Sequence, residues 1–173
     1  VVRLTDRVEN QGFAESPVML VYHVNFGYPL LDAGARVYSN AGEIVPRDAL
    51  AREGLDKYDL IEEPGVGRDE QCYFHVGMEK EGFAMLHNEA LGIAAIVRFD
   101  AETFPLLCEW KCMRAGDYAL GLEPTTAGVA GRADARSKGT LGFLQPGEAR
   151  EFAFELEMTD DDALIGKYRR MAR

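Results

Sequence analysis

Two side chains in this sequence, His23 and Glu123, are suited to moving protons on an uncharged polar substrate. His23 lies in the segment PVMLVYHVNFGYP, residues 17–29, and Glu123 lies in YALGLEPT, residues 118–125. An imidazole gains or loses a proton near neutral pH, and a carboxylate facing it completes an acid and base pair. One histidine and one glutamate without a nucleophile suit proton transfer better than glycoside hydrolysis, which generally uses two carboxyl groups. We therefore predict that His23 and Glu123 are catalytic.

Alternation along the two segments indicates which neighbours share a face with these residues. His23 and Asn25 point to the same side of a strand, about 7 Å apart, so Asn25 is a predicted substrate-binding residue. Glu123 shares its face with Gly121, whose missing side chain leaves room for a ligand or another backbone. Pro124 lacks an amide hydrogen and is expected to end the strand. The ordinary alternatives are a hydrogen-bonded histidine and a glutamate exposed on a solvent-facing strand.

Three further side chains are predicted to bind substrate. Trp110 and Lys111 lie on the strand expected before Tyr118, and an aromatic face there can stack on a sugar ring. Arg132 follows Glu123 by nine residues and can donate two hydrogen bonds to a hydroxyl or carboxylate. The alternatives are a tryptophan in the core and an arginine in a surface salt bridge. The histidines lack the spacing of a zinc site, so no metal is expected.

The elements that must position these residues are mostly strands, because the dominant period of the sequence is two. Residues 150–158 alternate as a half-buried strand, and residues 83–88 and 91–99 indicate a hairpin whose second strand is deeply buried. Further strands are expected over residues 17–26, 71–76, 106–113, 118–123 and 140–144. Helices are expected over residues 48–58 and 159–171, with Thr159 as the N-cap of the second. This pattern predicts a single all-β domain over residues 1–173, a sandwich or barrel.

Composition excludes several kinds of partner. Hydrophobic residues make up 47% of the chain, which is typical of a globular protein, and the formal net charge is −10. An acidic protein repels nucleic acid and anionic lipid, whereas a neutral sugar is unaffected. No apolar run approaches the roughly 20 residues that a membrane-spanning helix needs. The three cysteines are odd in number and lack CxxC spacing, which favours free thiols in the cytoplasm.

Several motifs in order resemble the aldose 1-epimerases, or galactose mutarotase-like proteins, and a less-characterised branch of them in particular. VYHVNFGYPLL, residues 21–31, resembles the strand with their catalytic histidine, and LGLEP, residues 120–124, resembles the segment with their catalytic glutamate. The resemblance extends from about residue 2 to residue 158. It implies a large antiparallel β-sandwich, here with a short C-terminal helix, and interconversion of the anomers of a free sugar. Glu123 would take the proton of the C1 hydroxyl and His23 would protonate the ring oxygen, with no metal or organic cofactor.

The resemblance also implies that the chain corresponds to the C-terminal half of these proteins. Their first half supplies another histidine and an arginine to the sugar, and this chain begins Val1-Val2-Arg3-Leu4, as if in a strand already under way. Family members hold sugar hydroxyls with an aspartate on a middle strand. Residues 69–75 occupy about that place, so Glu70 and His75 are predicted substrate-binding residues. The alternative is the exposed entrance of a strand.

Two other functions fit the same pattern. The fold could hold or sense a sugar without turnover, as a carbohydrate-binding module that tolerates loss of Glu123. The chain could instead be an inactive fragment that needs its N-terminal half. An incomplete sandwich leaves open sheet edges, so we expect association with that half or with another copy of the chain.

Overall fold

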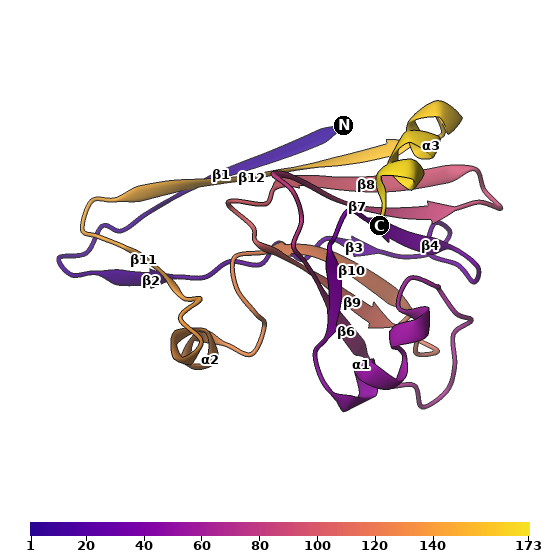
Figure 1. Ribbon diagram of the computed structural model, residues 1–173, viewed down its shortest axis with the longest axis horizontal. Coiled ribbons are helices and arrows are strands. Elements are labelled where there is room, and N and C mark those ends of the chain that lie inside the picture. The colour runs from indigo at the N-terminus through magenta and orange to yellow at the C-terminus, as the bar shows by residue number, and fades with distance from the viewer.

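The computed structural model describes residues 1–173 and consists of two antiparallel five-stranded sheets that face each other (Figure 1). The first sheet has the order β1 (Val2–Glu9), β12 (Ala149–Thr159), β8 (Ile93–Asp100), β7 (Glu81–Asn88), β4 (Arg36–Ser39). The second has the order β3 (Asn25–Phe26), β10 (Ala119–Thr125), β9 (Leu106–Cys112), β6 (Gln71–Val76), β5 (Glu43–Pro46). A two-stranded sheet pairs β11 (Gly142–Leu144) with β2 (Ser16–Val18). The molecule is the predicted all-β antiparallel sandwich.

The main core lies between the two large sheets. Leu86 and Val97 of the first sheet belong to one buried cluster with Leu107, Leu120 and Leu122 of the second. The opposite face of β7 and β8 is also buried, because helix α3 (Asp162–Met171) packs on it. Strands covered on both faces read as continuous apolar runs, which explains the deeply buried pattern of residues 91–99.

Three helices lie outside the two sheets (Figure 1). Helix α1 (Ala49–Glu53) and the 3₁₀ turn Leu55–Lys57 fall within the predicted helix of residues 48–58. Helix α2 (Arg132–Ser137) lies beside β11 and was not expected from the sequence. No helix has the length and apolar character needed to cross a membrane.

Three details of the strand and helix boundaries differ from expectation. Residues 17–26 form β2 and β3 with an irregular stretch between them, which bridges to β10 at Val21 and Thr125. Helix α3 starts after Asp161, because Thr159 still belongs to β12 and the Asp161 carboxylate accepts the amides of Ala163 and Leu164.

Pro124 does not end its strand, since β10 continues to Thr125. The Leu122 amide donates to the Val24 carbonyl, and the Pro124 carbonyl accepts from the Tyr22 amide. Backbone groups of alternate residues point to the same side of a strand. The amide hydrogen that Pro124 lacks would therefore point toward the irregular stretch before β3 and away from β9. For this reason the pairing of β10 with β9 is intact.

Candidate active site

The register of β3 and β10 brings His23 opposite Glu123. Asn25 pairs with Gly121, and Val21 bridges to Thr125, so His23 and Glu123 occupy the position between these two pairs. Opposed residues of antiparallel strands share a face. The Nε2 atom of His23 lies 3.0 Å from Oε1 of Glu123. The two residues predicted to be catalytic are therefore in contact on the outer face of the second sheet.

Asn25 orients the His23 ring. The Nδ1 atom of His23 lies 2.7 Å from Oδ1 of Asn25. An amide oxygen only accepts hydrogen bonds, so Nδ1 carries the hydrogen in this contact. The Nε2 atom is then the one that faces the carboxylate of Glu123. The predicted pairing of His23 with Asn25 is present, with Asn25 acting on the imidazole.

Glu123 is held in an environment that favours its neutral form. Its side chain is only 4% exposed, and Oε1 has no aligned hydrogen-bond partner although His23 lies close. Burial raises the pKa of Glu123 to about 7, against the opposing effect of His23. A carboxyl group that titrates near neutral pH can serve as a base or as an acid in the same reaction cycle.

Gly121 makes room for the Glu123 carboxylate. A Cβ atom at this position would overlap Oε1 of Glu123 and lie 3.0 Å from its Cδ. We expected the empty space beside Gly121 to admit a ligand or another backbone. The side chain of Glu123 itself fills that space, folded back over its own strand.

Trp110 forms the neighbouring wall of the site. It pairs with Gly121 across β9 and β10, and its indole ring meets the His23 ring edge to face at 5.5 Å between centroids. The indole Nε1 donates to Oε2 of Glu70 at 2.6 Å, and the Arg47 guanidinium donates to the other oxygen at 3.1 Å. These two bonds lower the pKa of Glu70. Glu70 therefore stays ionised over the pH range in which Glu123 titrates. Its bond to the indole also fixes the orientation of Trp110.

His75 and Lys111, which we expected to bind substrate, lie on the opposite face of the second sheet. Both side chains are buried, because they alternate with residues of the outer face such as Trp110. His75 contacts Oγ of Ser39 at 2.8 Å and a carboxylate oxygen of Glu109 at 2.9 Å. The structure therefore places His75 in an internal polar cluster that the candidate site does not reach.

The Lys111 side chain also points into the interior of the sandwich. Its ammonium group donates to the carbonyl oxygens of Lys57 at 2.9 Å and Leu60 at 2.6 Å. Burial lowers its pKa. These bonds tie the loop after α1 to β9, which is a structural role.

Arg132 lies at the start of α2, in a groove of about 450 Å³ that also includes Val21 and Thr125. Val21 and Thr125 form the next pair on the same face beside His23 and Glu123, so the groove adjoins the site. Arg47 was not anticipated from the sequence. Apart from its neighbour Asp48, its partners Glu70 and Cys72 are remote along the chain, and no local motif indicates them.

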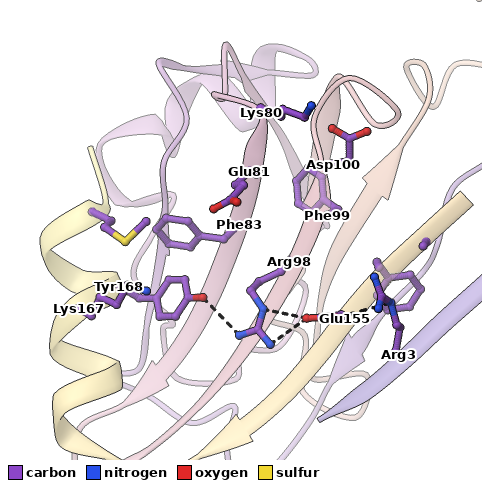
Figure 2. Close-up of a pocket in the computed structure, with 14 residues that line it drawn as sticks. Arg3, Lys80, Glu81, Phe83, Arg98, Phe99, Asp100, Glu155, Lys167 and Tyr168 are labelled. Carbon is purple, nitrogen blue, oxygen red and sulfur yellow. Dashed lines mark hydrogen bonds and ion pairs between the residues drawn. The ribbon is translucent and has the colours of Figure 1, made fainter.

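A second cavity, of about 400 Å³, lies between α3 and the outer face of the first sheet (Figure 2). Figure 2 shows Arg98 at its centre, held by Glu155 and the Tyr168 hydroxyl. Glu157 accepts a further bond from the same guanidinium. Because Arg98 is already paired, we interpret this cavity as a gap in the packing of α3 on the first sheet. It lies on the opposite side of the sandwich from His23 and Glu123. No group of three or more metal-binding side chains gathers anywhere in the described chain.

Comparison with known proteins gives a family and a fold. A family model described as "Domain of unknown function (DUF4432)" matches residues 1–158. A solved candidate aldose 1-epimerase from Klebsiella pneumoniae is 25% identical with a TM-score of 0.90, and covers 97% of this chain and 45% of its own. A galactose mutarotase-like protein from Clostridium acetobutylicum is 16% identical with a TM-score of 0.61, covering 91% of this chain and 52% of its own. A comparison with curated proteins found no match.

A candidate aldose 1-epimerase from Escherichia coli K12 is 19% identical with a TM-score of 0.61, and covers 91% of this chain and 55% of its own. The chain thus spans about half the length of these solved structures. The family model extends over nearly the whole chain and includes both His23 and Glu123. The chain therefore belongs to the DUF4432 family and has the galactose mutarotase-like fold.

Proposed function

We propose that this chain carries the acid and base pair of an isomerase of the aldose 1-epimerase type, which interconverts the anomers of a free sugar. The observation that carries the proposal is the 3.0 Å contact between His23 and Glu123, one partner half exposed and the other buried. A pKa of about 7 at Glu123 suits a group that must take up and return a proton in each cycle.

The proposed reaction moves two protons. The Glu123 carboxylate takes the proton of the C1 hydroxyl, and a carbonyl forms between C1 and that oxygen. The bond from C1 to the ring oxygen breaks, and its electron pair accepts a proton from His23 in the imidazolium form. Rotation about the bond from C1 to C2 presents the other face of the aldehyde, and closure reverses both transfers.

Substrate binding must open the pair, because a 3.0 Å contact leaves no space for a sugar oxygen. The side chain of His23 is 51% exposed, whereas that of Glu123 is enclosed, so the imidazole is the mobile partner. In this proposal Trp110 offers its ring as a wall for the sugar. Glu70 holds that ring in place through the indole hydrogen.

We propose that further contacts to the sugar come from residues outside this chain. The relatives are about twice as long as this chain. Strand β1 pairs only with β12, so its outer edge is open. We propose this edge as the place where additional strands, from the rest of a longer protein or from a second copy, would continue the sheet.

The test is exchange between anomers, measured by NMR on a panel of free sugars. Glu123→Gln and His23→Gln should each lower the catalysed rate by roughly a hundredfold or more. Glu151→Gln, an exposed glutamate on β12, is the matched control and should leave the rate unchanged. In the unmodified chain the rate should fall as pH drops below about 7, because Glu123 must be ionised to act as base.

Exchange that persists in Glu123→Gln would refute the proposed roles. A chain that binds sugars without accelerating exchange, even when an N-terminal segment like that of the longer relatives is added, would instead be a carbohydrate-binding module. Binding and exchange should therefore be measured on the same samples.

A further inference from the structure

The groove beside the candidate site has walls with almost no charge. It is lined by apolar, glycine and threonine residues and a single arginine: Pro17, Met19, Leu20, Val21, Thr125, Gly128, Val129, Gly131 and Arg132. Gly128 and Gly131 have open space where a side chain would lie, and the φ of +92° at Gly131 disfavours any other residue there. The backbone therefore stays accessible on one side of the groove.

Arg132 is the only charged residue of this groove, and its charge has no partner. It is exposed and forms no ion pair or side-chain hydrogen bond with the rest of the chain. The cavity under α3 differs, since Arg98 is paired there with Glu155 and Glu157. The chain as a whole has a net charge of −10, but solvent ions screen remote charges beyond about 8 Å. The groove is thus locally positive in an acidic protein.

The groove begins next to the acid and base pair. Val21 lies two residues before His23, and Thr125 lies two residues after Glu123, on the same face of the sheet. Two residues along a strand span about 7 Å. A sugar whose C1 lies at His23 and Glu123 can therefore direct a substituent into the groove.

We propose that this groove binds an oxyanion group on the sugar substrate, a carboxylate or a phosphate, through the guanidinium of Arg132. The inference rests on the proposed function and deepens it, because it names a negatively charged sugar as the substrate class. A guanidinium donates paired hydrogen bonds to such a group, and no acidic side chain in the groove competes for it.

The experiment compares D-glucose, D-glucuronate and glucose 6-phosphate, with binding followed by calorimetry and exchange between anomers followed by NMR. The chain should bind at least one anionic sugar about tenfold or more tightly than glucose. Arg132→Gln should reduce that preference, measured as the ratio of the two affinities, by roughly tenfold to a hundredfold. Arg170→Ala, an exposed arginine on α3, is the control and should leave the preference unchanged.

Each outcome decides between the two proposals. Exchange of glucose without any preference for the anionic sugars would contradict the proposed oxyanion site. It would still support the proposed isomerase function. A preference that Arg132→Gln removes, without exchange of any sugar even when an N-terminal segment like that of the relatives is added, supports the groove and overturns the isomerase. A preference for anionic sugars that persists in Arg132→Gln also contradicts the assignment. Tighter binding of glucuronate or of the phosphate shows which oxyanion the groove accepts.

Discussion

For Glu123, the proposed role and the contribution to stability oppose each other. Its carboxyl group is buried on the outer face of the second sheet with a raised pKa, whereas Glu70 nearby has a lowered pKa because Trp110 and Arg47 bind it. The two carboxyl groups therefore differ in charge near pH 7. Such a separation is what assigns different roles to two acidic groups in one site.

Glu123→Gln should stabilise the protein at pH 8 and have little effect at pH 5. The folded pKa of about 7 is above the ordinary value of 4.5, so folding favours the protonated form. Stability therefore falls as pH rises from about 4.5 to about 7, by up to roughly 3 kcal/mol, because only the unfolded state loses the proton readily in this range. Urea unfolding at the two pH values measures this. Equal effects at both values would show that Glu123 titrates normally.

Gly121→Ala should lower activity far more than stability. The added Cβ would overlap Oε1 of Glu123, and the carboxylate can avoid it only by rotating away from His23. A displacement of about 1 Å in a reacting group can lower the rate roughly a hundredfold. Exchange kinetics and the melting temperature should be compared with Gly27→Ala, where the new Cβ meets open space. Unchanged kinetics in Gly121→Ala would contradict this role.

At the scale of elements, the candidate site depends on the pairing of β3 with β10, and helix α3 depends on its N-cap. The antiparallel register of β3 with β10 places His23 against Glu123 even though β3 itself is only two residues long. Helix α3 is anchored at its start by the Asp161 carboxylate and packs through Ile165 and Tyr168 against the first sheet. The two arrangements are on opposite sides of the sandwich.

Asp161→Ala should destabilise the protein by about 1 kcal/mol and leave sugar chemistry unchanged. The substitution removes an acceptor for two amides of the first turn of α3, those of Ala163 and Leu164. Asp160→Ala, which removes a neighbouring carboxylate with no capping bond, is the control for charge. If both variants lose equal stability, the cap does not contribute through its hydrogen bonds.

For the whole molecule, a buried polar contact joins the two large sheets within the apolar core. Ser39 belongs to β4 of the first sheet, and its Oγ contacts His75 of the second. His75 in turn binds Glu109, whose other oxygen lacks a partner. Buried polar groups are costly when left unpaired, so this contact helps to fix how the sheets sit on each other.

Ser39→Ala should reduce the free energy of unfolding by roughly 1–3 kcal/mol, because Nδ1 of His75 loses its buried partner. The rate of exchange should stay the same, since His75 lies on the face opposite His23. Ser16→Ala changes an exposed serine without a side-chain bond and should have almost no effect. A stable Ser39→Ala variant would mean that water replaces the hydroxyl.

The sequence alone was enough to predict the class of fold and the residues of the central pair. Period-two alternation identified most of the strands of both sheets, since one buried face imposes that period on each strand. His23 and Asn25 were placed together for the same reason, and the structure confirms their contact. The four-residue strands β4 and β5 and the short helix α2 were missed, because so few residues carry little periodicity.

Only the tertiary structure decided which candidates share the site. Strand alternation puts Trp110 and Lys111 on opposite faces, but it does not say which face meets the other sheet. The register between strands distant in sequence sets the contact of His23 with Glu123 and turns His75 inward. The partners of Glu70 likewise come from β9 and from the segment before α1. Side-chain type and local pattern are properties of the chain, whereas burial, pairing and pKa arise only when remote strands are packed together.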